Sequence, residues 1–321
     1  MDVLSDLLHR AQAGNTVARQ LVHRPPWSLA FADPPSLCVV APLDGRASVR
    51  LDERGEAPAC LAAGDIALIS RAGAHTVADS PDTPPQMVIK GAKKKILSGN
   101  GHRNLAPRTY GDGLPGATTL LRGGFDLRGG AGERVLDMLP PLAVIPAGPR
   151  TKPALDLLAD EMARDEPGQD AVLRRLLDFL LVLALRAWCA RPESVVPAWY
   201  RALSDPAIGE TLRLLHEDPA RRWTVADLAA EAGMSRAAYA ARFVDLVGKP
   251  PLGYLTEWRM TLAADLLRDT EDTIAAVARK AGYADAFAFS VAFKRAHGVS
   301  PSHWRRSTTG TTPGRRPRPR R

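Results

Sequence analysis

Two stretches near the end of the chain carry cationic, small polar and aromatic residues at helical spacing, each beginning at a residue that can cap a helix. A helix in the major groove of DNA reads bases and phosphates with such side chains, placed on one face. The first stretch offers Ser235, Arg236, Ala237, Ala240, Ala241 and Arg242. The second offers Asp285, Ala286, Phe287, Ser290, Val291, Lys294 and Arg295. The spacing indicates two candidate DNA contact surfaces.

The elements that must position these side chains are two pairs of short amphipathic helices, each pair a helix-turn-helix. In the first pair Thr224 and Ser235 can cap the two helices, and Gly233 supplies the left-handed residue of the turn. Tyr239 and Phe243, four residues apart, are expected to point inward. The second pair repeats the pattern with Ile274, Val277, Ala281, Gly282, Phe289 and Phe293.

One continuous helix is expected over residues 252–268, between the two pairs. It would be about 25 Å long at about 1.5 Å per residue. The two pairs can therefore reach successive major-groove segments, which lie about 34 Å apart. Phe287 leaves two alternatives open, because its ring could contact a thymine methyl group or pack against the neighbouring pair.

The last third of the chain resembles the AraC/XylS family of bacterial transcription regulators over residues 203–306. The resemblance rests on residues 282–283, 289–295, 298–301 and 304–305, and on earlier matches at 223–224, 228–229, 234–236, 247–248, 251, 254–255 and 258–260. It implies a sequence-specific transcription regulator that binds double-stranded DNA. RNA polymerase is a further expected partner if the protein is an activator.

One departure from the family pattern concerns the contact surfaces themselves. Members usually carry an arginine two residues before the inward phenylalanine of each recognition helix, but here these positions are Ala241 and Val291. Arg236 and Arg242 are the candidates to replace the missing cation in the first helix, and Lys294 and Arg295 in the second. Two alternatives are a weakly binding, degenerate domain and an architectural DNA-binding protein without sequence preference.

The charge of the chain supports the same location for DNA binding. Residues 1–221 contain 26 basic and 26 acidic residues, whereas residues 222–321 contain 17 basic and 9 acidic residues, which gives the whole net charge of +8. A basic end on a neutral body is typical of a phosphate-binding module. Five of those cations are arginines of the tail over residues 307–321, which is predicted to be disordered.

Residues 27–88 have the rhythm of an antiparallel sandwich or barrel, since short apolar runs at 37–40, 47–51, 66–69 and 87–89 alternate with Gly, Pro and Asp turns. A further strand is expected at 118–121. Residues 91–116 are expected to be loop, with Lys93 to Lys95 as a solvated turn. Residues 64–75 resemble the second motif of the cupin barrel, in the form found in the sensor domain of one AraC subgroup. That resemblance implies a sensor for an unknown small-molecule effector or chemical signal.

A catalytic cupin would need a histidine pair and a carboxylate to hold a metal ion. No histidine lies on the expected strand at 37–40, and His75 alone cannot form such a site. We therefore predict no catalytic residue, metal or cofactor. His75 is expected to be a hydrogen-bonded histidine at the barrel mouth and is a weak candidate for the ligand site. The alternative is a metal-dependent cupin enzyme fused to a DNA-binding domain.

The predicted fold class is α+β: a cupin-like β-barrel (1–150), a helical linker (151–200), an all-α double helix-turn-helix domain (203–306) and the tail. The leucine-rich helix expected over 171–190 is either buried within its own domain or packs on a second subunit, and a homodimer is expected. Cys38 and Cys60 are interpreted as buried small apolar residues rather than a redox switch, and Cys189 has no metal-type spacing. The longest apolar run is too short to cross a membrane, and a cytoplasmic protein is expected.

Overall fold

A computed structural model describes residues 2–11, 17–52, 57–71, 73–91, 93–98, 103–113 and 115–309. The chain divides into two compact units. The first, here called the sandwich unit, comprises Gln12–Leu127 and Leu136–Val196; the second, here called the helical unit, comprises Met1–Ala11, Arg128–Val135 and Pro197–Arg321. Sheets in one unit and helices in the other confirm the predicted α+β class.

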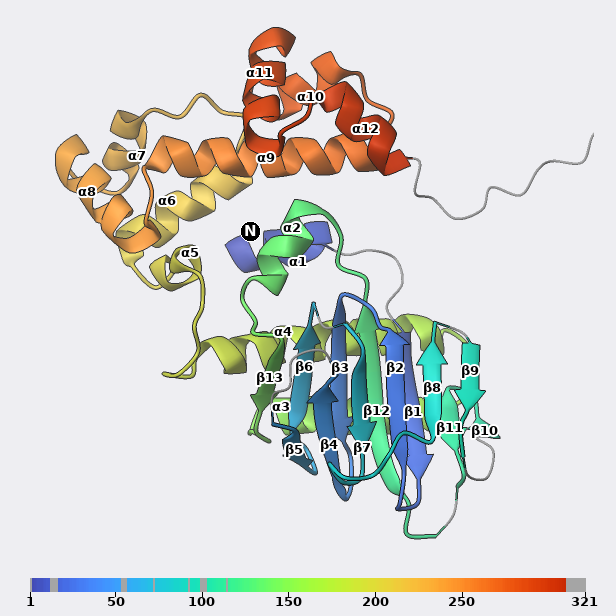
Figure 1. The fold of residues 1–321 in the computed structure, drawn as a ribbon. Helices are drawn as coiled ribbons and strands as arrows, with labels where there is room; N and C mark the ends of the chain where they lie inside the picture. Colours follow the sequence, from blue (N-terminus) through green and yellow to red (C-terminus); the bar gives the residue numbers. More distant parts are fainter. Residues whose placement is uncertain are drawn as a thin grey trace, which may run out of the picture. The chain divides into compact units, whose positions relative to one another are not determined.

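The sandwich unit is built from two sheets (Figure 1). One has the order β10-β11-β1-β12-β3-β6-β13, with bounds Arg103–Ala106, Thr109–Gly111, Val17–His23, Thr118–Phe125, Leu37–Pro42, Ile66–Ser70 and Leu142–Ile145. The other has the order β5-β4-β7-β2-β8-β9, with bounds Ala59–Ala62, Arg46–Leu51, His75–Ala78, Ser28–Asp33, Met87–Lys90 and Lys93–Ile96. Alternate residues of both sheets, among them Leu29, Val40, Val77 and Leu120, form the core between them.

The five apolar runs singled out in the sequence all lie in strands, so this part of the prediction is confirmed. The prediction of loop over residues 91–116 is wrong, because β9, β10 and β11 lie there. Lys93, Lys94 and Lys95 form the edge strand β9, which pairs only with β8 in its sheet, and their side chains are exposed. A run of lysines lacks the apolar alternation by which a strand is recognised in a sequence, so this edge strand could not be predicted. Lysines are nevertheless common on edge strands, where they keep the edge from pairing with another chain.

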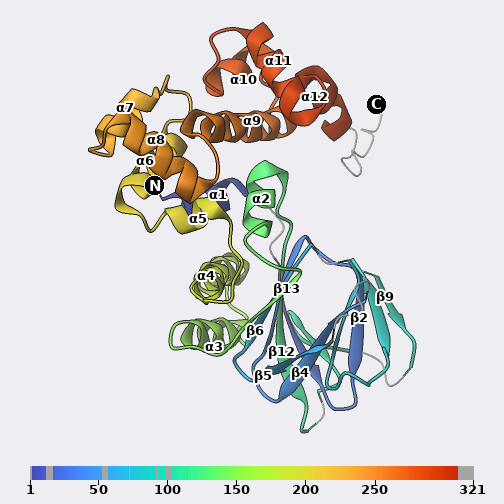
Figure 2. The same ribbon diagram turned by 60° about the vertical axis from the view of Figure 1, so that its left-hand side comes forward.

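Two helices, α3 (Thr151–Met162) and α4 (Gln169–Cys189), lie along the outer side of the seven-stranded sheet (Figure 2). A β-carbon on Gly123 of β12 would lie 2.8 Å from Cδ1 of Leu177, so any other residue at this position would displace the Leu177 side chain of α4. The segment predicted as a linker over 151–200 thus belongs to the sandwich unit as far as Val196. The leucine-rich face of α4 is buried within this unit, which agrees with the alternative that the helix is buried in its own domain.

The helical unit does not follow the sequence order of the predicted domains. It contains α1 (Val3–Ala11) and α2 (Gly129–Leu136, of which Leu136 already counts with the sandwich unit) together with α5 to α12. The bounds of the latter are Ala198–Ala202, Pro206–Glu217, Val225–Glu231, Arg236–Val247, Pro251–Asp269, Ile274–Lys280, Ala286–His297 and Pro301–Thr309. Helix α12 extends three residues past the predicted module end at 306, and residues 310–321 of the predicted tail lie outside the described residues.

Candidate nucleic-acid interface

The first helix-turn-helix consists of α7 and α8. Thr224 caps α7 in a capping box, since its hydroxyl accepts from the Asp227 N–H while the Asp227 carboxylate accepts from the Thr224 N–H. Gly233 has φ +63° in the turn, and the Ser235 hydroxyl accepts from the Ala238 N–H at the start of α8. The helices therefore begin and turn at the residues that the sequence indicated.

The second helix-turn-helix, α10 and α11, repeats this geometry. Thr273 and Asp285 cap its helices, and Gly282 turns the chain at φ +78°. Phe289 and Phe293 are fully buried in a core with Val277 and residues of α9, as Tyr239 and Phe243 are in the first pair. The predicted inward faces of both recognition helices, α8 and α11, are confirmed.

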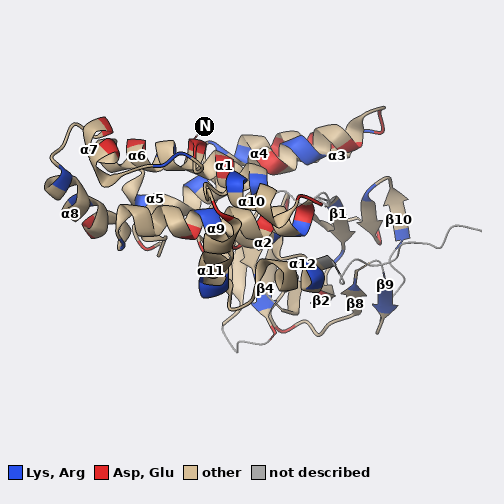
Figure 3. Cartoon of the chain, turned by 90° about the horizontal axis from the view of Figure 1, so that it is seen from above, with Lys and Arg blue, Asp and Glu red and all other residues tan. Residues whose placement is uncertain are grey.

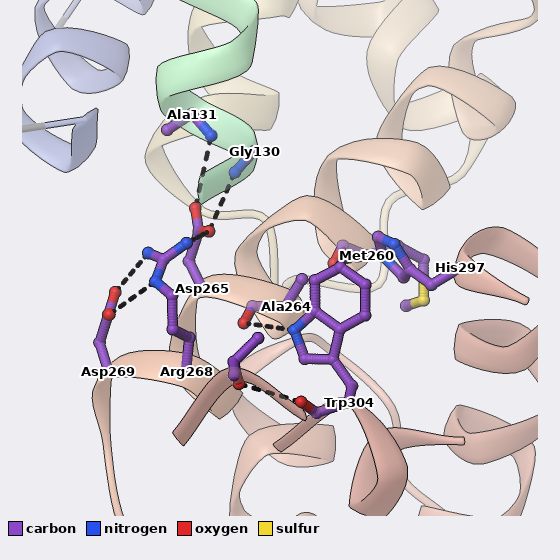
Figure 4. Close-up of polar contacts among 10 residues, drawn as sticks. Gly130, Ala131, Met260, Ala264, Asp265, Arg268, Asp269, His297 and Trp304 are labelled. Carbon is purple, nitrogen blue, oxygen red and sulfur yellow. Dashed lines mark hydrogen bonds and ion pairs between the residues drawn. The ribbon is translucent and has the colours of Figure 1, made fainter. Parts of the chain in front are cut away.

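Helix α9 joins the two pairs as one continuous helix, as predicted, and side chains fasten it to both. The Arg259 guanidinium donates to the carbonyls of Pro219 and Arg221, just before the first pair. On the second pair, the Trp304 indole donates to the Ala264 carbonyl and the His297 ring contacts the Met260 carbonyl oxygen (Figure 4). Helix α9 therefore positions both recognition helices within one unit.

The predicted contact residues divide into an exposed group and a partly buried group. Most are exposed: Ser235, Arg236, Ala237, Ala241, Arg242, Asp285, Phe287, Val291, Lys294 and Arg295. The partly buried ones are Ala240, Ala286 and Ser290, whose hydroxyl donates to the Ala286 carbonyl. The side chain of Phe287 is 77% exposed, so the structure does not show the alternative in which its ring packs against the neighbouring pair.

The cations of this surface differ in how firmly they are held. Arg242 donates from Nε to the Asp205 carboxylate over 3.0 Å, and this hydrogen bond holds the pKa of Asp205 below its usual value. Arg236, Lys294 and Arg295 are exposed, the last two near the C-terminal end of α11 (Figure 3). Arg242 is thus already bound to Asp205, whereas Arg236, the other candidate cation of α8, is exposed.

A group of buried polar side chains in the helical unit, linked by hydrogen bonds, was not predicted from the sequence. His216 of α6 is fully buried, stacks on Trp258 at 4.4 Å between ring centroids, and has its two ring nitrogens 2.7 Å from the Tyr254 hydroxyl and 3.3 Å from the Asp6 carboxylate. Burial lowers the pKa of His216. The guanidinium of Arg10 lies 5.9 Å from the Trp258 ring centroid. Helix α1 is thus part of the core that supports the first recognition helix.

Helix α2 docks on α9 through its N-terminus (Figure 4). The Asp265 carboxylate accepts from the N–H groups of Gly130 at 3.0 Å and Ala131 at 3.4 Å, and it also accepts from Arg268 at 3.0 Å. A β-carbon on Gly130 would lie 2.5 Å from Cγ2 of Thr261, so the close approach requires glycine. Burial raises the pKa of Asp265, although Arg268 and both N–H groups favour its charged form. The glycine-rich run 129–132 was the available sequence signal for this contact.

In the sandwich unit, His75 lies on β7 with no exposed surface, which corrects its expected position at a hydrogen-bonded barrel mouth. Neither ring nitrogen meets the geometry of a hydrogen bond, although the backbone of Gly73 is close enough to favour the charged imidazole slightly. Burial, and then the charge of Arg122, lower the pKa of His75 to about 4. Within the described ranges, no three His, Cys, Asp or Glu side chains gather as metal ligands do. Cys38 is buried as predicted, but Cys60 is exposed.

Comparisons with known proteins agree with both units. A cupin family model matches residues 2–190 and a helix-turn-helix domain model matches residues 228–307. An AraC-like transcription regulator of Streptomyces lividans is 34% identical over 96% of this chain and 99% of its own length. The transcriptional regulator AlkR of Acinetobacter baylyi is 32% identical over 76% of this chain and 80% of its own length.

Among solved structures, the DNA-binding domain of AdpA in complex with a target DNA covers 34% of this chain and 98% of its own, at 32% identity and a TM-score of 0.33. Separately, none of the described helices is both long and apolar enough to span a membrane.

Proposed function

Because the chain belongs to the AraC-like transcription regulators, with a cupin domain and a DNA-binding helix-turn-helix domain, we propose that it regulates transcription in response to a chemical signal. The observation that carries the proposal is the pair of capped recognition helices, each with a buried aromatic face and an exposed face. We propose that the exposed members of the predicted contact set bind double-stranded DNA in the cytoplasm.

The first experiment uses the full chain, because α1 and α2 pack within the helical unit and a fragment from residue 203 would lack them. Selection from a pool of random duplexes should recover a preferred sequence with two separated contact segments. Affinity for it should fall steeply with salt, since each neutralised phosphate contributes a slope of about −0.9 in log affinity against log salt. Recovery of no preferred sequence would instead favour an architectural DNA-binding protein.

The substitution Val291→Arg tests the contact surface of α11. Val291 is 49% exposed at the position where the family usually has arginine, so the new cation is expected to tighten DNA binding several-fold. A phosphate contact would steepen the salt slope by about one unit, whereas a base contact would change the preference at one position by about 1–3 kcal/mol.

The control is Ala296→Arg, an exposed position about 140° away around the same helix axis. A titration of each variant against the selected and a scrambled duplex, at several salt concentrations, makes the comparison. Equal effects of the two variants would mean that Val291 does not face DNA. Ala241→Arg on α8 tests the first contact surface in the same way.

We propose that α2 carries the signal between the units. It is joined by short segments to β12 before it and β13 after it, yet it docks on α9, the helix that joins the two helix-turn-helix pairs. A signal that changes β12 or β13 therefore acts on the ends of a helix that is held by Asp265. This arrangement couples the sensor to the DNA-binding helices through the chain itself.

The substitution Asp265→Ala removes the carboxylate that caps α2. It is expected to lower the free energy of unfolding by about 1 kcal/mol, the usual contribution of a helix cap, and to speed hydrogen exchange of the α2 amides. The matched control is Asp269→Ala, since Asp269 also bonds to Arg268 but is 56% exposed and contacts no α2 amide in the described structure. Equal exchange in the two variants would contradict the docking role of Asp265.

We propose that the protein is not an enzyme. Its relatives are transcription regulators, and the residues that sequence reasoning required for a metal-dependent cupin are missing from β3. The alternative of a metal-dependent cupin enzyme has a direct check in elemental analysis of protein purified without a histidine tag. Stoichiometric iron, zinc or manganese would favour that alternative.

We further propose a homodimer, with α3 and α4 contributing to its interface. Val172 and Phe179 are 44% and 51% exposed and lie seven residues apart on α4, and Leu157 of α3 is 52% exposed. Apolar residues seven apart share one helix face and suit a second helix of the same kind. Sedimentation velocity of the full chain measures the oligomeric state. If the protein activates transcription, RNA polymerase is a further partner.

A further inference from the structure

A group of polar side chains lies in the core between the two sheets of the sandwich unit, near one end of β7. Arg122 of β12 points inward, because its neighbour two residues away, Leu120, and its cross-strand partner, Val40, both belong to the core. His75 and Phe31 are directly opposite each other on the facing sheet, with their rings stacked at 5.1 Å. The guanidinium of Arg122 lies 4.1 Å from the Phe31 ring centroid and thus joins the two sheets.

Arg122 carries a charge that no ion pair within the described part of the chain balances. Its Nη2 donates to the Cys38 sulfur over 3.7 Å, and its Nε is buried without a hydrogen-bond partner. No carboxylate among the described residues forms an ion pair with it. Burial raises the pKa of Cys38 although the charge of Arg122 opposes this shift, so the thiol stays protonated near pH 7 and supplies no counter-charge. Desolvating the Nε of a guanidinium whose only contacts are a thiol and an aromatic ring is costly unless an anion joins it.

His75 adds a neutral hydrogen-bonding group to the same place. Both of its ring nitrogens are buried, and the nearby Gly73 backbone does not meet the geometry of a hydrogen bond with either. Its pKa of about 4 means that the imidazole is neutral near pH 7, so one nitrogen carries a proton to donate. Buried polar groups without partners are uncommon in proteins, and here Arg122 and His75 reach the same core region from facing sheets.

We propose that Arg122 and His75 form the effector site of this regulator, and that the site takes a small organic monocarboxylate with an apolar body. The planar guanidinium matches the two oxygens of a carboxylate, and the imidazole N–H donates a further hydrogen bond. Arg122 is only partly buried, so part of the residue is accessible to an entering ligand.

The charge and the lining select this class of ligand. Arg122 supplies one positive charge and the neutral His75 none, so a single negative charge balances the site, whereas a phosphate dianion would leave one charge uncompensated. The surroundings are apolar, with Phe31, Leu51 and Leu120 in the same core, which favours an apolar body next to the carboxylate. Sites of this kind combine an apolar lining with a few convergent polar groups.

This inference rests on the proposed sensing role, and it means that the effector binds to a residue of β12. Arg122 lies on β12, which ends at Phe125 only four residues before α2 begins at Gly129. A carboxylate that draws the guanidinium toward itself therefore acts on the strand that leads directly into the docked helix. The site and the coupling helix are consecutive in the chain.

Calorimetry and thermal unfolding of the full chain, without DNA, test the site. The probes are acetate, benzoate and octanoate, with benzamide as the neutral analogue of benzoate and inorganic phosphate as the dianion. At least one of the two carboxylates with an apolar body should raise the melting temperature and bind more than tenfold tighter than benzamide or phosphate. No preference for any carboxylate over benzamide, or tighter binding of phosphate, would overturn the assignment.

Two substitutions locate the binding at Arg122. Arg122→Met should leave the unliganded protein at least as stable as the wild type, because it removes a partly buried charge that has no ion-pair partner, and should abolish the carboxylate response. Arg122→Lys keeps the charge but loses the planar guanidinium that can donate to both carboxylate oxygens, and it should weaken carboxylate binding at least tenfold. Arg46→Met, at an exposed position of β4, is the control and should change neither property. A carboxylate response that survives both Arg122 substitutions would overturn the site.

A DNA titration with and without the bound carboxylate then tests sensing separately. A change in DNA affinity that is lost in Arg122→Lys supports the site as the effector site. Carboxylate binding with unchanged DNA affinity would refute the effector role while leaving the regulator's DNA binding intact. Loss of DNA binding under all conditions would instead count against the proposed function.

Discussion

Replacing Phe289 with alanine should lower the free energy of unfolding of the helical unit by about 3–5 kcal/mol, because the ring is fully buried among residues of α9, α10 and α12. The ring packs against Tyr283 and Phe293 at centroid distances of 5.7 Å in each case. Such contacts add to the cost of the cavity that the substitution would leave. Since α11 is held chiefly by this core, DNA binding should be lost with it.

The matched control is Phe287→Ala, two residues away on the same helix. Phe287 is 77% exposed, so its removal should leave the stability within about 0.5 kcal/mol of the wild type while it weakens DNA binding. Urea denaturation of the full chain with each substitution measures the difference, and a DNA titration under native conditions follows. Similar stabilities for the two variants would mean that the recognition helix is phased differently from the structure.

The helix-turn-helix units could be predicted from the sequence because every local signal in them agrees. Caps, turn glycines and inward aromatic residues lie within about twenty residues of one another, and each has a physical reason that requires no distant partner. Ser235, Gly233 and Phe243 therefore carried the prediction, and the structure confirms their positions. The same reasoning identified the strands with apolar runs.

The parts that could not be predicted depend on residues far apart in the chain. Asp265 caps a helix that begins at Gly129, and Asp6 contacts His216 across more than two hundred residues. In the sequence Arg122 cannot be told apart from a solvated cation on a strand, because Phe31 and His75, which lie near it in the fold, come from the facing sheet. In each case the sequence shows only a charged residue, whose default interpretation is a solvated surface position.

The stability of the sandwich unit should fall in acid because of His75. The pKa of His75 lies at about 4 in the folded protein, owing first to burial and then to the charge of Arg122, whereas an unfolded histidine has its ordinary value of 6.5. Above pH 6.5 the imidazole is mostly neutral in both the folded and the unfolded state, so its titration does not change the free energy of unfolding. Between pH 6.5 and about 4 the unfolded state binds a proton that the folded state excludes, so the free energy of unfolding falls as the pH falls.

The expected loss across this window is about 3 kcal/mol, from about 1.4 kcal/mol for each pH unit. His23 of the same unit should add to it, because burial also lowers its pKa, so only the comparison of variants isolates His75. Urea denaturation from pH 7 to pH 4.5 should show a markedly shallower fall for His75→Gln than for the wild type. His303→Gln, at an exposed position, is the control and should follow the wild type. If the free energy of unfolding of His75→Gln and of the wild type fell equally with pH, His75 would titrate at its ordinary pKa. The neutral, buried imidazole that the carboxylate site requires would then be contradicted.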